Sequence, residues 1–135
     1  MEATVTWTTG MTFQADLDGH RVGIAVPGPD GAGEGPRPKA LLLAGLGGCT
    51  GVDVVGILEK MRVPFEGLAV EVQAEESTSH PKVFTRIHVR YRFKGRALPL
   101  DKLQRAVQLS QEKYCGVSAM LGKAAAISSE IVIEG

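Results

Sequence analysis

Two cysteines, Cys49 and Cys115, are the residues of this sequence with the clearest capacity for chemistry. Cys49 lies in GLGGCTG, whose glycines each cost a helix about 1 kcal/mol relative to alanine. Such a cost is expected where a ligand or a partner helix approaches the backbone. Cys115 precedes Gly116, where a predicted helix ends. A cysteine serves as a small buried apolar residue or, as a thiolate, as a nucleophile, and the position of Cys49 alone leaves both interpretations open.

The spacing of these residues does not predict a metal site or a cofactor. The cysteines are far apart in the sequence, so the CxxC spacing of redox and zinc-ribbon motifs is absent. A zinc site would need two further ligands from His20, His80 and His88, and none of these has metal-type spacing to a cysteine. His80 and His88 are more simply a turn residue and a solvated strand residue.

The composition is that of one globular domain. Its length of 135 residues and its 44% hydrophobic residues suffice for a core without disulfides or structural metal. Lys plus Arg and Asp plus Glu each number 15, so the formal net charge is zero. Nucleic-acid binding usually requires a basic surface and is therefore not expected. A neutral chain also offers little electrostatic resistance to self-association.

One apolar segment, Ala40 to Leu58, is long enough to span a bilayer. Asp53 would lie inside such a span, five glycines weaken the helix, and no aromatic residue marks either end. We interpret the segment as a buried helix and expect no membrane association. The N-terminus lacks the basic and apolar regions of a signal peptide, so a cytoplasmic protein is expected. A structural disulfide is rare in that compartment.

The elements that position the cysteines can be predicted from hydrophobic periodicity and turn residues. A helix is predicted from Lys39 to Met61, and because its middle is apolar on every face we expect a second copy of the chain to help cover it. A Pro/Gly-rich loop over residues 27–38 precedes it, and Asp18-Gly19 predicts a hairpin turn. Three N-terminal strands are expected at Thr4–Thr8, Thr12–Leu17 and His20–Val26.

The second half of the chain is predicted to combine a hairpin with two helices. Residues 68–75 and 83–93 alternate with period two, the second strand with Val83, Thr85 and Ile87 on one face. Glutamates of the first strand are expected to pair with arginines of the second. The remaining predicted elements are a turn at Ser77–Pro81, a helix at Leu100–Tyr114, a short helix at Val117–Ala124 and a strand at Ile127–Ile133. The prediction is a single α+β domain over residues 1–135 with an antiparallel sheet.

Two segments carry a resemblance to a known family. GLGGCTGVDVVGILEKM and AVQLSQEKYCGVSAMLGKA resemble the two cysteine motifs of the OsmC/Ohr family (osmotically inducible protein C and organic hydroperoxide resistance protein), and its OsmC-like branch in particular. The order of the strands and the Pro/Gly-rich loop fit as well, so the resemblance covers nearly the whole chain. It implies antiparallel sheets wrapped around two long central helices in an intertwined homodimer, with two active sites at the subunit interface.

The same resemblance implies thiol peroxidase chemistry. Cys49 matches the peroxidatic cysteine, which would attack an organic hydroperoxide, and Cys115 matches the resolving cysteine, which would close a disulfide with the resulting sulfenic acid. An external dithiol, of the lipoyl type in the family, would reduce that disulfide. The alternative is a redox-sensitive or small-ligand-binding module of the same fold with little peroxidase turnover.

The charges that would activate Cys49 differ from those of the Ohr branch, which has an arginine after the first strand and a glutamate ten residues before the first cysteine. Met11 and Lys39 occupy these positions here. Asp53, one helical turn after Cys49, is the strongest polar candidate, with a structural hydrogen bond as its alternative role. The other supporting candidates, each of which is otherwise a solvated charge, are Arg21, Glu34, Arg37, Lys39 and Glu112.

Overall fold

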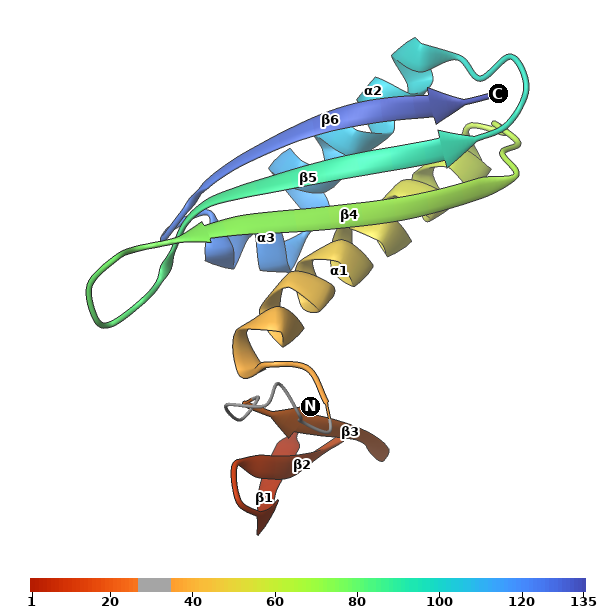
Figure 1. Ribbon diagram of the computed structural model, residues 1–135. Helices are drawn as coiled ribbons and strands as arrows, with labels where there is room; N and C mark the ends of the chain where they lie inside the picture. Colours follow the sequence, from red (N-terminus) through yellow and green to blue (C-terminus); the bar gives the residue numbers. More distant parts are fainter. Residues whose placement is uncertain (27–34) are drawn as a thin grey trace. The chain divides into compact units, whose positions relative to one another are not determined.

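The computed structural model describes residues 1–26 and 35–135 (Figure 1). Most of the predicted Pro/Gly-rich loop and the candidate Glu34 lie outside the described residues. Within them the chain forms two compact units, Met1–Leu42 and Leu43–Gly135. Whether they act as the single domain predicted from the sequence stays a prediction, and each unit is described by itself.

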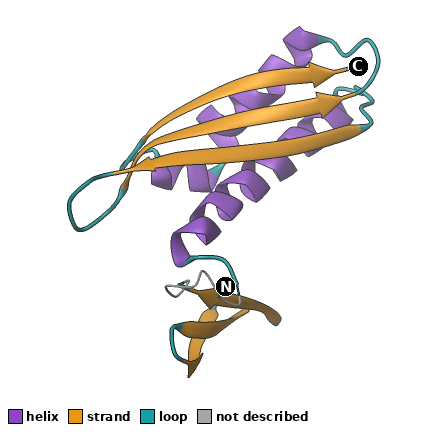
Figure 2. Ribbon diagram, viewed as in Figure 1, coloured by secondary structure: helices purple, strands orange, loops and turns teal. Residues whose placement is uncertain are grey.

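The first unit contains a three-stranded antiparallel sheet in the order β1-β2-β3 (Figure 2). The strands are β1 (Ala3–Thr9), β2 (Thr12–Leu17) and β3 (His20–Ala25), close to the predicted ranges. Asp18 and Gly19 both have positive φ, at 48° and 84°. This is the backbone conformation that a two-residue hairpin turn requires, so the turn predicted from Asp-Gly is confirmed.

Helix α1 (Pro38–Lys60) contains Cys49 and matches the prediction within one residue at each end. Pro38 is tolerated at its start because the first helical N–H groups have no intrahelical partner. Leu46, Thr50, Val54 and Leu58 form a buried stripe with a spacing of four residues. This stripe faces the sheet of the second unit and belongs to its core.

The glycines around Cys49 permit close packing of α1 against a strand. A Cβ added at Gly47 would lie 3.4 Å from Val72, and one added at Gly51 would lie 3.5 Å from Val70. Both valines belong to β4 (Gly67–Glu76). The approach that the sequence predicted for this glycine-rich segment is therefore made, at least in part, by a strand of the same chain.

The opposite face of α1 remains open in the single chain. Val52, which lies on this face, is 74% exposed. The predicted burial on all sides is thus not achieved within one chain, and cover by a second copy stays a prediction. By length and composition α1 is also able to cross a bilayer. That observation is weak, because core helices of soluble proteins have the same properties.

The second unit is built on a three-stranded sheet in the order β4-β5-β6, with α1, α2 and α3 on one side of it (Figure 1). Strand β5 (Phe84–Lys94) pairs antiparallel with β4, but β6 (Ala126–Glu134) pairs parallel with β5. The prediction of an antiparallel sheet was wrong for this last pair. The reason is that the helices between β5 and β6 return the chain to the end of the sheet where β5 begins, which is how parallel neighbours are connected.

The start of β5 differs from the predicted alternation. Phe84 is buried, whereas Val83 is 47% exposed and Thr85 also faces solvent. The pairing register shifts between Glu75 and Glu76 on the neighbouring strand. Such a bulge reverses which residues face the core. Beyond it the alternation is as predicted, with Ile87, Val89, Tyr91 and Phe93 buried.

Ion pairs connect the strands on the other face of this sheet. Glu71 lies 2.9 Å from Arg92 and 3.7 Å from Arg90, and Glu75 lies 3.9 Å from Arg86. The predicted pairing of glutamates with arginines is confirmed. Glu130 of β6 extends the ladder with a further ion pair to Arg90.

The predicted helix Leu100–Tyr114 is present as two segments. Helix α2 (Leu100–Leu109) is followed by η1 (Ser110–Tyr114), a π-helical turn, and then by α3 (Gly116–Leu121). The backbone N–H of Cys115 donates to the carbonyl of Ser110, five residues earlier, at 2.7 Å. Hydrophobic periodicity cannot identify one π-turn at the end of an α-helix, because five residues are too few to show a change of period.

Candidate active site

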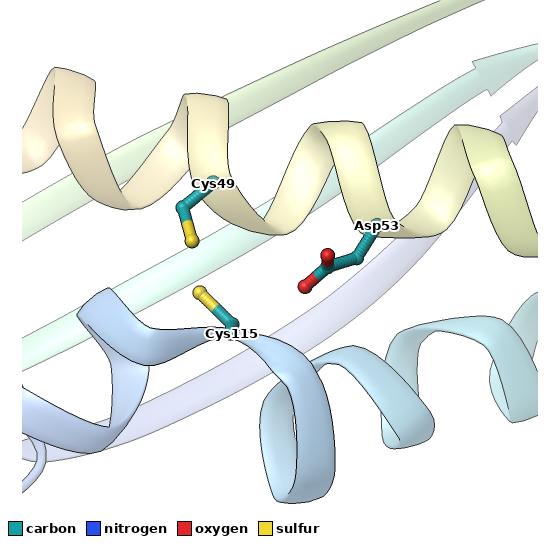
Figure 3. Close-up of side chains that lie close together, drawn as sticks. All are labelled: Cys49, Asp53 and Cys115. Atoms are coloured by element: carbon teal, nitrogen blue, oxygen red, sulfur yellow. The ribbon is translucent and has the colours of Figure 1, made fainter.

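The two cysteines, distant in sequence, meet between α1 and the segment that joins η1 to α3. Figure 3 shows the side chains of Cys49, Asp53 and Cys115 pointing toward one another. The two Sγ atoms and a carboxylate oxygen of Asp53 all lie within 4.8 Å of one another. Cys115 is buried at 3% exposure, whereas Cys49 and Asp53 are partly exposed. All three residues belong to the second unit.

Each of these side chains is held by regular structure. Cys49 and Asp53 are four residues apart on α1, so they project from the same face of the helix. Cys115 has extended backbone angles (φ −76°, ψ 103°) and is the N-cap of α3. Its Sγ accepts a hydrogen bond of 3.4 Å from the backbone N–H of Ser118. A side chain that caps a helix in this way has one preferred direction, and here it is toward α1.

The environment of Cys115 favours a neutral thiol. Burial raises the pKa of Cys115, and negative charge on the neighbouring Cys49 raises it further. The hydrogen bond from Ser118 acts in the opposite direction and is the smaller effect. A neutral, buried thiol is a poor attacking group, because the thiolate is the nucleophile. This environment suits a cysteine that reacts after its partner has been oxidised better than one that attacks a substrate itself.

A chain of buried hydrogen bonds ends on Asp53. Ser110 Oγ donates to Asp53 Oδ2 at 3.0 Å, and Thr50 Oγ1 lies 2.7 Å from both the Ser110 and the Tyr91 hydroxyl oxygens. Gln111 Nε2 donates to the Tyr91 hydroxyl oxygen at 3.0 Å. Burial raises the pKa of Tyr91, which keeps its hydroxyl protonated.

The direction of this chain follows from counting protons. Each hydroxyl has one hydrogen to donate. Ser110 donates its hydrogen to Asp53, so Thr50 must donate to Ser110, and Tyr91 must donate to Thr50. Every bond from Gln111 onward therefore points toward the carboxylate of Asp53. Hydrogen bonds aligned in this way reinforce one another.

The three clustered residues could be predicted from the sequence, but the chain of hydrogen bonds that ends on Asp53 could not. Ser110 falls within the predicted helix Leu100–Tyr114, and Tyr91 falls within the strand predicted over residues 83–93, on the same face as Ile87. Both are buried as expected, and the missed signal was their hydroxyl groups, which require partners once buried. Thr50, directly after Cys49, belongs to the same class.

The remaining candidates lie elsewhere. Arg21 is an exposed residue of β3 whose partner is Asp16 at 3.4 Å. Arg37 is exposed, and Lys39 lies in the first turn of α1. These three residues belong to the first unit, whereas both cysteines belong to the second, so a role for them at the cysteines stays a prediction. Glu112 is exposed on η1 and is not part of the cluster of Cys49, Asp53 and Cys115.

An open pocket of about 250 Å³ lies beside Asp53. Val52, Gly56 and Ile57 give it an apolar wall, and Lys60 and Tyr114 complete its lining. The hydrogen bonds that reach Asp53 and Cys115 come from Ser110 and from the Ser118 backbone, which are neutral donors. The site thus combines two thiols with a carboxylate that accepts from a neutral donor and borders a partly apolar pocket.

Comparison with known proteins places this site in a family. A family model for OsmC-like proteins matches residues 31–130. Protein YhfA of Escherichia coli K12 is 38% identical over 129 residues, which cover 95% of this chain and 94% of YhfA.

Solved structures support the same fold. The OsmC-like protein of Mycoplasma pneumoniae has a TM-score of 0.87 at 14% identity, over 99% of this chain and 96% of that one. The organic hydroperoxide resistance protein OsmC of Legionella pneumophila has a TM-score of 0.69 at 15% identity, over 98% and 97% of the two chains. The resemblance inferred from the two cysteine motifs is confirmed, and the chain belongs to the family of OsmC-like proteins.

Proposed function

We propose that this protein is a thiol-dependent peroxidase that reduces organic hydroperoxides. The observation that carries the proposal is the meeting of Cys49 and Cys115, whose Sγ atoms lie within 4.8 Å of each other. A disulfide requires an S–S distance of about 2.05 Å, so a small movement of the capping segment suffices to close it. The family supports the proposal because it includes proteins named for organic hydroperoxide resistance.

The first chemical step takes place at Cys49, the more exposed of the two cysteines. Its thiolate attacks the distal oxygen of the hydroperoxide, the O–O bond breaks, and the leaving alkoxide takes up a proton to become an alcohol. Cys49 is left as a sulfenic acid. The apolar pocket wall of Val52, Gly56 and Ile57 favours an organic substituent over hydrogen peroxide.

The second step takes place at Cys115. Its thiol loses a proton, its sulfur attacks Sγ of Cys49, and the sulfenic oxygen leaves as water. An external dithiol then reduces the disulfide by thiol exchange, and we propose a lipoyl-type compound for this role. Burial protects Cys115 from direct oxidation until Cys49 has reacted.

Asp53 is the proposed proton acceptor and donor of the cycle. Its carboxylate lies close to both sulfur atoms and is fixed by the hydrogen bond from Ser110. Taking the proton from Cys49 leaves Asp53 able to return it to the departing alkoxide. A carboxylate cannot stabilise a thiolate by charge, so this site differs in kind from one that uses an arginine.

The proposed assembly is a homodimer, in a reducing cytoplasm. An apolar groove of about 570 Å³ lies along the open face of α1 and includes Gly48, Val52 and Val55 of the helix and Leu68 and Val70 of β4. Contiguous apolar surface of this kind is typical of an interface. We expect a second copy of the chain to cover it.

The alternative is a redox-sensitive or ligand-binding module with little turnover. One observation favours it: the donors that reach Asp53 and Cys115 are neutral, and Met11 stands where the Ohr branch has an arginine. Neutral donors stabilise a thiolate less than a cation does, and the thiolate is the form that attacks a peroxide.

The deciding experiment is turnover of cumene hydroperoxide and of hydrogen peroxide with dihydrolipoamide as reductant. We expect the wild type to reduce cumene hydroperoxide faster than hydrogen peroxide. Cys49→Ser should abolish turnover. In Cys115→Ser, Cys49 should be over-oxidised rapidly. Asp101→Asn, an exposed carboxylate on α2, serves as the matched control and should retain full turnover. An intact, reduced protein without turnover would overturn the peroxidase proposal and favour the alternative.

A further inference from the structure

We propose that the reduced protein has a second activity at this site: Cys49, Asp53 and Cys115 together bind one thiophilic divalent cation, with Zn²⁺ as the preferred ion. The proposal does not rest on the peroxidase function, because binding needs only the two reduced thiols and the carboxylate. The sequence alone suggested the two cysteines as ligands, and none of the histidines has a suitable spacing to them. The third ligand is Asp53, which the fold brings to the pair.

The spacing of the ligand atoms suits a small tetrahedral ion. Zn–S distances of about 2.3 Å and Zn–O distances of about 2.0 Å place neighbouring ligand atoms about 3.5–3.8 Å apart. In the structure the two Sγ atoms and the carboxylate oxygen lie within 4.8 Å of one another. An inward movement of about 1 Å, which side-chain rotation provides, therefore completes the coordination geometry.

The ligands are supported by regular structure on both sides. Cys49 and Asp53 come from one face of α1, and Cys115 is fixed as the N-cap of α3 (Figure 3). A site on such elements loses less conformational entropy on binding than one on loops. The two donors that already reach the ligands, Ser110 on Asp53 Oδ2 and the Ser118 N–H on Cys115 Sγ, are the kind of outer partner that orients metal ligands.

The donor set identifies the class of ion. Two thiolates with one carboxylate favour Zn²⁺ over the hard ions Mg²⁺ and Ca²⁺, which take oxygen ligands. Binding releases the thiol protons of Cys49 and Cys115, and the resulting ligand charge of three exceeds the charge of the ion. Three protein ligands leave the fourth tetrahedral position for water. Oxidation of the two thiols to a disulfide removes two of the three ligands, so binding is confined to the reduced protein.

The test is a titration of the reduced full-length protein with Co²⁺, a spectroscopic substitute for Zn²⁺, followed by displacement with Zn²⁺. We expect one Co²⁺ per chain, a thiolate-to-cobalt charge-transfer band and the intense visible bands of a tetrahedral ion, all lost on addition of Zn²⁺. Cys49→Ser, Cys115→Ser and Asp53→Asn should each weaken binding about tenfold or more. Asp101→Asn makes the same chemical change on an exposed carboxylate and should bind as the wild type does.

The variants are chosen so that loss of binding reports loss of a ligand. Serine is a strongly preferred N-cap, so Cys115→Ser keeps the cap of α3. Asparagine retains the oxygen that accepts from Ser110, and far-UV circular dichroism checks the fold of each variant. Absence of a charge-transfer band, or unchanged affinity in Asp53→Asn, would overturn the proposal. Neither result would bear on peroxidase turnover, which is assayed without metal.

Discussion

Ser110 and Asp53, which come from different helical segments, share a hydrogen bond of 3.0 Å at the point where the cysteines meet. The bond links the π-turn η1 to α1 and fixes one carboxylate oxygen of Asp53. The other oxygen is left for a proton, an ion or a thiol. The same serine accepts from Thr50 and so connects Asp53 to the core.

Loss of the Ser110 hydroxyl should destabilise the protein. In Ser110→Ala the Thr50 hydroxyl loses the group to which it donates, and an unpaired buried donor costs about 1–3 kcal/mol. The free energy of unfolding, measured with urea, should fall by that amount. Ser129→Ala, at an exposed residue of β6, is the matched control and should change the free energy of unfolding by less than about 0.5 kcal/mol. Equal stability of the two variants would show that the hydrogen-bond chain is unimportant.

Cys115 should react slowly with alkylating reagents. In Cys49→Ser only Cys115 remains, and burial still raises its pKa although the charge of Cys49 is gone. A raised pKa means less thiolate near neutral pH. The pH at which the alkylation rate reaches half its maximum should therefore be higher in the folded variant than in the same variant unfolded in urea. The measurement is the rate of iodoacetamide labelling against pH. A midpoint at or below the unfolded value would contradict the pKa shift.

The ion pair of Glu130 and Arg90 should make stability depend on pH. The hydrogen bond and charge of Arg90 lower the pKa of Glu130. A carboxyl group with a lowered pKa stabilises the folded state above its ordinary, unfolded pKa, and this contribution is lost as the pH falls through the lowered value. Between pH 7 and pH 3, the melting temperature should therefore fall by less in Glu130→Gln than in the wild type. Parallel curves for variant and wild type would refute this assignment.

A charge on the open face of α1 should dissociate the proposed homodimer. Val52 is 74% exposed and lines the apolar groove, so Val52→Glu leaves the core of the single chain intact and adds a charge where a second copy would bind. Light scattering after gel filtration should give a dimer for the wild type and a monomer for the variant. Gln108→Glu, exposed on α2, should remain dimeric. A wild type that is monomeric at all concentrations would contradict the proposed assembly.

The sequence predicted most of the fold because its patterns are local. Alternation identified β4 and β5, and the four-residue spacing of Cys49 and Asp53 placed both on one helix face. The parallel pairing of β6 could not be predicted from its residues, because pairing depends on the path of the preceding helices. The burial of Phe84 was not predicted because Thr85 is an extra, unpaired residue of β5, and such a bulge reverses the alternation.

The candidate site was predicted in part. The cysteines were found through their motifs, and Asp53 through its position in an apolar helix. The roles of Thr50, Ser110 and Tyr91 depend on which hydroxyls face one another across three elements, and this information is not local. The metal proposal was missed because only histidines were considered as additional ligands.

The π-turn η1 determines the directions in which the side chains of Ser110 and Cys115 point relative to each other. In an α-helix each residue turns about 100° around the axis, so the residue five positions after Ser110 would lie about 140° away from it. The hydrogen bond from the Cys115 N–H to the Ser110 carbonyl spans five residues in a wider turn instead, and the side chains of both residues reach α1. Removing one residue from Ser110–Tyr114 would restore the ordinary turn and present a different residue to Cys49. The length of this segment, more than its composition, therefore determines which side chain completes the pair.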